Sequence, residues 1–374
     1  MTVSAIGSSI GRRGIQTFEN LDSQVNITRT GKTLITQGTG GRSSRTGYTA
    51  TVFGAPGFLG TVLTAKLARQ GTITVAPFRE EIHKRHLKVT GDLGVVNFME
   101  WDIRNIKSIE DSVKHSDIVY NLVGRNYTTK NFSYHDVNVE GAKRIAEAVK
   151  KFNVPRLVHV SSHSVDPNSA SEFYRTKALG EEVVRDIIPD ATIVRPGPMY
   201  GLGDKFLNKL AQQKYVLLPN EGKETFYPTL VNDVATALEK IGYDDSTAGK
   251  TFELNGPKLY TKSELLDAIR DATKNEIKDV NISKGAYQAI SKLAQNLFWA
   301  TTSPDEIERM FIDQVVDKNA LGFGDLGITP KSLESRILHL LRFHRSNVYL
   351  HETVEAEAAR KKDEETYTNI IDRL

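Results

Sequence analysis

Three glycines at positions 54, 57 and 60 constrain the fold of this chain more than any other feature. They lie in the segment GAPGFLG, between a short apolar run at 49–53 and an amphipathic run at 58–69. A second apolar run, 72–78, follows at the spacing of a β-α-β unit. In such a unit the first glycine ends the strand, the second lets a ligand approach the backbone, and the third lets the helix pack on the sheet. The segment predicts a dinucleotide-binding turn: Gly54, Gly57 and Gly60 shape it, and the backbone at Phe58 and Leu59 faces the phosphates.

Short β-branched runs continue to alternate with amphipathic runs beyond this unit. We expect strands at 95–101, 118–123, 157–161 and 192–195, with helices at 106–114, 134–152 and 171–188. Gly71 is expected to end the first helix. This alternation predicts an α/β fold, a Rossmann doubly wound parallel sheet. Beyond residue 201 the pattern loosens, with helices expected at 231–241 and 263–272, and predicts a smaller mixed α/β lobe.

Four segments follow from this pattern. Residues 1–47 form an N-terminal arm, 48–200 a Rossmann NADP(H)-binding domain, 201–350 a C-terminal lobe interleaved with it, and 351–374 a charged tail. Residues 1–18 contain Arg12, Arg13, three serines and no acid, which fits a matrix-targeting presequence or a disordered extension equally well. Residues 19–48 are polar and rich in Gly, Thr and Ser, and predict an extended arm rather than a packed element.

Composition excludes several classes of protein. The chain has no cysteine, so disulfides, catalytic thiols and thiolate metal sites are absent. A formal net charge of +3 gives no reason to expect a nucleic-acid partner. No run reaches the roughly 18–20 apolar residues that are needed to span a bilayer.

The end of the second strand indicates which dinucleotide is bound. An NAD-binding fold places an acid there to hold the ribose 2′-hydroxyl, whereas this chain has Arg79. A guanidinium suits a 2′-phosphate, so Arg79, with Lys84 and Arg85 nearby, favours NADP(H) over NAD(H). Alternatively, Arg79 is a solvated surface residue whose charge is partly cancelled by Glu80 and Glu81.

Together these motifs resemble the extended and atypical short-chain dehydrogenase/reductases. The resemblance implies further residues around the cofactor: Asp102 and Ile103 at the adenine edge, Leu122 and Gly124 at the fourth-strand turn, Ser161 or its neighbour Ser162 as the hydroxyl, Lys177 on the ribose, and Pro196 in the loop that covers the nicotinamide.

Further stretches resemble the short-chain-dehydrogenase-like accessory subunits of mitochondrial NADH:ubiquinone oxidoreductase (respiratory complex I). They are GGRSS at 40–44, ATVFGA at 50–55, KALGE at 177–181 and DKFLN at 204–208. The resemblance is close over 40–237 and thinner in the C-terminal third. It implies a peripheral protein on the matrix side of the inner membrane, with NADPH as a tightly bound cofactor, other complex I subunits as partners, and a role in assembly and stability.

The catalytic residues of the resembled family are incomplete. Those enzymes use a Tyr whose phenol transfers a proton and a Lys four residues later that stabilises the phenolate. Here the Lys is Lys177, and the residue four before it is Phe173, which has no proton to transfer. Tyr174 lies one residue on and is expected to point away, since one residue turns a side chain by about 100° around a helix. We therefore expect a protein without catalytic residues.

Two alternatives remain open from the sequence: an active NADPH-dependent reductase that uses Tyr174 or a water, and a soluble NADP(H) redox sensor. His159 and His163 flank the serines, but no further ligand stands at metal-binding spacing. Residues 287–299 carry an apolar stripe at helical spacing, beginning with Tyr287, Ile290 and Leu293. This stripe fits lipid contact, a groove on a partner subunit, or a core helix.

Overall fold

The computed structural model describes residues 25–27, 31–38, 44–297, 303–317 and 320–345, and four single positions at 356, 359, 360 and 362. The expected presequence at 1–18, residues 40–43 of the GGRSS segment, and most of the charged tail lie outside the described residues. Within the described part, no helix is both long and apolar enough to cross a bilayer.

A seven-stranded sheet forms the centre of the molecule, in the order β13-β8-β7-β6-β3-β4-β5 with every pair parallel. Its strands are β3 (Thr49–Phe53), β4 (Ile73–Phe78), β5 (Val96–Glu100), β6 (Ile118–Asn121), β7 (Arg156–Val160), β8 (Thr192–Pro196) and β13 (Thr251–Leu254). The expected doubly wound fold is confirmed. The strand order reverses between β3 and β6, which is where ligands bind in such sheets, beyond the carboxyl ends of the strands.

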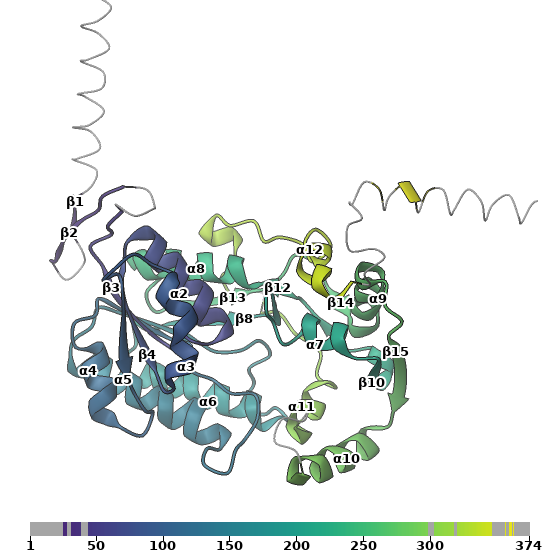
Figure 1. The fold of residues 1–374 in the computed structure, drawn as a ribbon. Coiled ribbons are helices and arrows are strands. Elements are labelled where there is room, and N and C mark those ends of the chain that lie inside the picture. The colour runs from purple at the N-terminus through teal and green to yellow at the C-terminus, as the bar shows by residue number, and fades with distance from the viewer. Residues whose placement is uncertain are drawn as a thin grey trace, which may run out of the picture.

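Helices cover both faces of the sheet (Figure 1). On one face α2 (Phe58–Gln70) packs beside α8 (Val231–Tyr243), and on the other lie α4 (Ile106–Val113), α5 (Gly141–Lys151) and α6 (Glu172–Ile187). Each buries an apolar stripe, such as Leu63 and Leu67 of α2 against Leu238 of α8. As expected, α2 ends at Gly71, whose φ of 83° is the left-handed conformation of a helix C-cap.

The helix expected at 134–152 contains a wide turn. A π-helical turn, Asp136–Glu140, precedes α5. It brings the Asn138 carbonyl so close to α6 that a Cβ at Gly180 would lie 2.4 Å from that oxygen. The Asn138 amide also donates to the Thr176 hydroxyl at 3.1 Å. These two contacts set the position of α6 along the sheet, and with it the position of Lys177 near the carboxyl ends of the strands.

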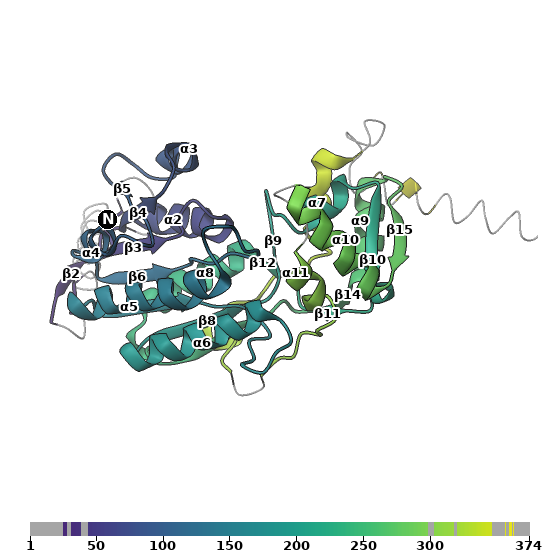
Figure 2. The same ribbon diagram turned by 90° about the horizontal axis from the view of Figure 1, so that it is seen from below.

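A second lobe stands beside the sheet and has its own apolar core (Figure 2). It contains α7 (Leu207–Gln212), α9 (Lys262–Thr273), α12 (Ile337–Leu341) and the parallel pair β10 (Tyr215–Pro219) and β15 (Lys278–Ile282). Two short pairs contribute side chains to this core: β9 (Met199–Tyr200) with β12 (Thr229–Leu230), and β11 (Thr225–Phe226) with β14 (Tyr260–Thr261). At its edge lie α10 (Lys284–Leu297) and α11 (Pro304–Arg309).

The N-terminal arm is not unpacked, so the expectation for this segment is wrong in its described part. Strands β1 (Val25–Ile27) and β2 (Thr33–Ile35) pair antiparallel. Leu34 is only 1% exposed, and Lys32 forms an ion pair with Asp117 at 2.8 Å. A Cβ at Gly71 would lie 1.8 Å from the Ser44 carbonyl oxygen, so the arm also lies tightly against the end of α2. The polar composition of the arm concealed Leu34, the one buried apolar side chain among its described residues.

Candidate nucleotide-binding site

The glycine turn (residues 54–60) has a backbone that other residues would not fit. Gly54 has a φ of 86°, and a Cβ there would lie 3.2 Å from the Leu122 carbonyl oxygen. The Gly57 amide donates to the Gly54 carbonyl at 2.9 Å, which closes the turn. A Cβ at Gly60 would lie 2.2 Å from that carbonyl oxygen, so only glycine lets α2 pack this closely. The local geometry thus requires glycine at 54 and 60, whereas at Gly57, which has an ordinary φ of −76°, a Cβ would lie 3.1 Å from the Gly54 carbonyl oxygen.

The N-terminus of α2 presents uncompensated positive charge at this turn. Its N-cap, Gly57, has no side chain to accept from the first amides, and the first turn contains no acid. The amides of Phe58, Leu59 and Gly60 therefore have no acceptor within the helix. Together with the helix dipole they form the kind of site that binds phosphate.

Arg79 lies exposed at the end of β4 with its charge uncompensated. Within the described residues its side chain forms no ion pair or hydrogen bond. The two neighbouring acids are engaged elsewhere: Glu80 pairs with His83 at 3.3 Å and Glu81 with Lys84 at 2.5 Å. Arg79 is thus a solvated surface residue, as the alternative interpretation has it, but neither neighbouring acid is bonded to it and its guanidinium remains available to an anion.

Buried polar atoms without partners gather at the carboxyl ends of β6 and β7. The Ser161 hydroxyl is buried and has no hydrogen-bond partner in the described structure. Lys177 of α6 is 5% exposed, and its Nζ forms no ion pair or hydrogen bond with any described residue. A Cβ at Gly124 would lie 3.1 Å from that Nζ, so the ammonium lies directly at the β6 turn. Burial lowers the pKa of Lys177 to about 8, partly offset by Glu181.

The remaining expected contacts lie at the ends of their strands. Asp102 follows β5, is exposed, and accepts from the Arg104 amide at 2.8 Å. Ile103 beside it is buried against α5. The Leu122 amide donates to the Phe53 carbonyl at 3.0 Å, which joins β6 to the glycine turn. Pro196 is the buried last residue of β8. The carboxyl ends of these parallel strands form one edge of the sheet.

Phe173 and Tyr174 lie in one buried aromatic cluster on α6, with their ring centres 5.6 Å apart. The Tyr174 hydroxyl lies 3.2 Å from the His163 Nε2, and burial raises the pKa of Tyr174 to about 12. Burial likewise lowers the pKa of His163 to about 4. Phe173 packs edge-on against Tyr134, and the Arg309 guanidinium lies 4.6 Å from the centre of its ring. No local sequence signal pointed to Arg309, which comes from 136 residues further along the chain.

His159 is part of the buried core beneath this site. Its Nδ1 lies 3.0 Å from the amide nitrogen of Asn121, and burial lowers its pKa to about 3, with the Lys177 charge adding to the effect. The ring is therefore neutral at physiological pH. In the part of the chain that the structure describes, no three His, Asp or Glu side chains gather as metal ligands.

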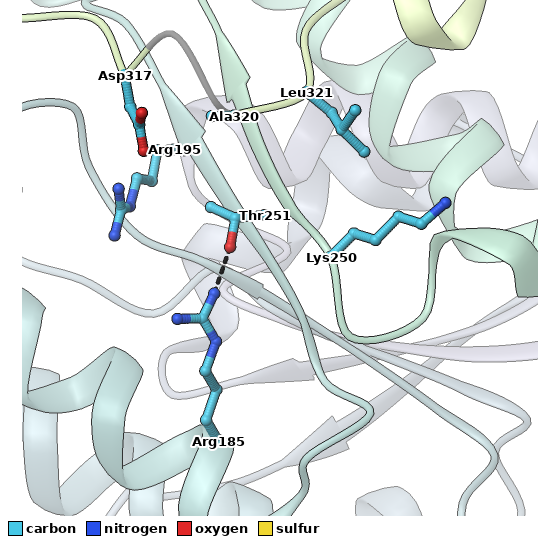
Figure 3. A pocket seen from close by; sticks show the side chains of 7 residues that line it. All are labelled: Arg185, Arg195, Lys250, Thr251, Asp317, Ala320 and Leu321. Carbon is cyan, nitrogen blue, oxygen red and sulfur yellow. Dashed lines mark hydrogen bonds between the residues drawn. The ribbon is translucent and has the colours of Figure 1, made fainter.

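A cavity lies elsewhere, beyond β8 at the β13 edge of the sheet (Figure 3). It has a volume of about 370 Å³. Arg195 at its wall is held by Glu181 at 2.7 Å and Glu253 at 3.5 Å, and Arg185 donates to the Thr251 hydroxyl. Two strands, β8 and β7, lie between β13 and β6, the first strand beyond the switch point, so this cavity is not part of the candidate nucleotide site.

Comparison with known proteins agrees with this geometry. Residues 50–252 match the model of the NAD dependent epimerase/dehydratase family. Among solved structures, dTDP-glucose 4,6-dehydratase DesIV of Streptomyces venezuelae, with NAD and TYD bound, is 17% identical with a TM-score of 0.61. That likeness covers 81% of this chain and 99% of the other. At this identity it shows the fold alone.

Two curated relatives are much more similar in sequence. The mitochondrial NADH-ubiquinone oxidoreductase 40 kDa subunit of Neurospora crassa is 52% identical over 344 residues, 92% of each chain. The mitochondrial NADH dehydrogenase (ubiquinone) 1 alpha subcomplex subunit 9 of Mus musculus is 37% identical over 328 residues, 86% of this chain and 87% of its own. This chain therefore belongs to the NAD dependent epimerase/dehydratase family and, within it, to the group formed by these 40 kDa and alpha subcomplex subunit 9 proteins.

Proposed function

We propose that this chain is a non-catalytic, NADPH-binding accessory subunit of mitochondrial respiratory complex I that supports assembly and stability of the complex. Relatives that match nearly its whole length are named as subunits of that enzyme. One observation supports the proposal that the chain is non-catalytic. Lys177 is present and buried, but Phe173 stands four residues before it, at the position where a proton donor would stand.

The residues present fit NADPH. The glycine turn and the α2 amides suit the diphosphate, and the unpaired Arg79 suits the 2′-phosphate. The Ser161 hydroxyl and the Lys177 ammonium, which no described residue bonds, suit the nicotinamide ribose, because buried polar groups without a partner are costly and a ligand would satisfy them. We assign Asp102 and Ile103, which follow β5, to the adenine end. NADPH supplies a hydride when bound, but this chain offers no matching proton donor.

The active-reductase alternative is disfavoured by the surroundings of Tyr174. Its hydroxyl is buried beside His163, and its pKa is raised to about 12, away from the range that proton transfer at neutral pH requires. α6 is a continuous α-helix from Glu172 to Ile187, so no irregularity returns Tyr174 to the position of Phe173.

A peripheral position on the matrix face of the inner membrane, with lipid contact through α10, completes the proposal. Ile290 and Leu293 of α10 are 53% and 66% exposed, so the core-helix interpretation is wrong for these two residues. Tyr287 is partly buried, and Phe298 and Trp299, which end the expected stripe, lie outside the described residues. An exposed apolar face with Lys292 beside it suits a lipid surface.

The test is a charge reversal at the 2′-phosphate site, Arg79→Glu, expressed in cells whose own copy has been removed. We expect loss of NADPH from the purified protein and a lower amount of assembled complex I on native gels. The matched control is Arg69→Glu, an exposed arginine on α2 away from the strand ends. Unchanged NADPH content in Arg79→Glu would contradict the cofactor assignment, and full assembly without NADPH would contradict its structural role.

A further inference from the structure

One aspartate of α11 holds the first turn of α6. The Asp305 carboxylate accepts from the Ser171 hydroxyl, at 3.0 and 2.9 Å to its two oxygens, and from the Glu172 amide at 2.8 Å. Ser171 is the N-cap residue of α6, yet its own side chain does not cap the helix. Asp305 thus supplies the cap from 134 residues away, and its charge suits the helix N-terminus.

The same segment covers Phe173. The Arg309 guanidinium lies 4.6 Å from the centre of the Phe173 ring, and its Nη2 donates to the Asn126 carbonyl at 3.0 Å. Its Nε lies 3.4 Å from Asp305, one helical turn earlier. Tyr134 closes another side of the ring, with centroids 5.9 Å apart. Phe173 is left only 5% exposed.

The segment continues past α11 and is tied to the second lobe. Ile312 packs on the same aromatic cluster. The Asp313 carboxylate accepts from the Thr225 amide at 2.9 Å, and Gln314 accepts from the Tyr227 amide at 2.8 Å. Figure 1 draws α11 between the end of α6 and α10. We call residues 303–314 the strap, because they cross from α6 to the second lobe and are bonded at both ends.

The ribose side of the candidate site and the side around Phe173 therefore differ in how far the chain itself fills them. On the ribose side, the buried Ser161 hydroxyl has no hydrogen-bond partner among the described residues, and the Lys177 side chain is 5% exposed and bonded to none of them. One helical turn earlier, Phe173 is enclosed on several sides by side chains of the strap and by Tyr134. A substrate that exchanged a proton with position 173 would have to lie within hydrogen-bond reach of it, about 2.6–3.2 Å. Arg309 and Tyr134 already occupy that surrounding space.

We propose that the strap is a built-in occupant of the substrate position, so that the chain admits a nucleotide but excludes a carbonyl substrate. The proposal rests on the proposed cofactor site, because the position of the cofactor defines the side from which a substrate would approach. The enclosure of Phe173 itself depends only on the strap. Two separate barriers to turnover then exist: position 173 has no proton donor, and the strap fills the space above it. The substitution Phe173→Tyr removes only the first barrier.

The absence of cysteine allows a direct test of the enclosure. Phe173→Cys introduces the chain's single thiol at the enclosed position, and Arg175→Cys places one at an exposed position on the same helix. With a small methanethiosulfonate reagent, we expect the Phe173→Cys thiol to react at least about tenfold more slowly, because reaction requires local opening of the strap. Equal rates would overturn the proposal.

If the strap shields the thiol at position 173, substitutions that loosen the strap should speed the reaction of that thiol. Adding Arg309→Ala, or separately Asp305→Asn, to Phe173→Cys is expected to raise the rate to within a few-fold of the exposed control. Loss of the Arg309 cation alone raises the pKa of a nearby thiol and slows its reaction, so acceleration reports opening rather than charge. Glu306→Gln is the matched control, since its carboxylate forms no ion pair or hydrogen bond among described residues. Circular dichroism confirms that each variant is folded.

The result separates this proposal from the proposed function. Protection in chains that bind no NADPH would support the strap while contradicting the cofactor assignment. NADPH binding with an unprotected Phe173→Cys thiol would overturn the strap and leave the cofactor assignment standing. Protection that neither Arg309→Ala nor Asp305→Asn reduces would also overturn it, because the strap would then not be the cover.

Discussion

The positions of single residues at the glycine turn and at the end of β4 could be predicted from the sequence because they depend on local structure. The spacing of Gly54, Gly57 and Gly60 depends on one turn, and Arg79 follows directly from the end of a strand. The pairing of Glu81 with Lys84, rather than with Arg79, was not predictable from composition. Side-chain pairing depends on a local fold that the sequence leaves open.

Gly60 allows a prediction on stability. Gly60→Ala would place a Cβ 2.2 Å from the Gly54 carbonyl oxygen, so α2 must move from the sheet. We expect the free energy of unfolding to fall by about 1–3 kcal/mol, the usual cost of overpacking, measured by denaturant titration. Gly285→Ala is the control: it lies in α10 with nothing within 4 Å of the added Cβ, and should be neutral or stabilising. Similar losses in both variants would contradict this account of the turn.

Lys177 allows a prediction on pH. Its pKa in the folded chain is lowered to about 8 from 10.5, so its contribution to the stability of the nucleotide-free fold rises with pH between these values. If the Lys177 ammonium donates to the ribose, NADPH affinity instead decreases as the pH rises, because the deprotonated amine lacks the charge that strengthens this bond. We expect NADPH affinity to be flat below pH 8 and to fall above it, by at most about tenfold per pH unit. Lys177→Met should weaken binding at pH 7 and remove the dependence; a dependence that persists would exclude Lys177 as its source.

At the scale of elements, the alternating pattern predicted the six strands and the five main helices over 49–195 and 231–241, because each pairs or packs with near neighbours in sequence. β13, the seventh strand, was missed. It has four residues, it carries Glu253 between apolar ones, and it joins β8 only after the chain has passed through the second lobe. α11 was missed for a similar reason: six residues are too few for a helical period to appear.

The exposed face of α10 gives a prediction about membranes. Leu293→Glu adds charge to a side chain that is 66% exposed, so the fold should keep its melting temperature. Binding to anionic phospholipid vesicles, measured by co-sedimentation, should weaken because a charged group enters the interface poorly. The control is Leu93→Glu, at a fully exposed leucine in the loop before β5. Equal vesicle binding by native chain and both variants would contradict lipid contact through α10.

At the scale of the molecule, the two lobes are joined by pieces of chain that return from far away. α8 covers the sheet beside α2 after the first part of the second lobe, and the strap crosses back to α6. Such long-range contacts have no local signature, so the sequence indicated the nucleotide side of the site but not the cover over Phe173. A ligand that binds only this native arrangement stabilises all of it, by about 2.7 kcal/mol at a hundred times its Kd.

The central claim is that the chain holds NADPH as a structural cofactor and does not turn it over. The most direct test is to purify the native protein, release its bound nucleotide, identify it by mass and redox state, and challenge the intact protein with carbonyls and quinones. The account predicts NADPH in one-to-one amount that resists oxidation. Nucleotide that oxidises and is replaced at a steady rate would contradict it, as would a protein that carries no nucleotide.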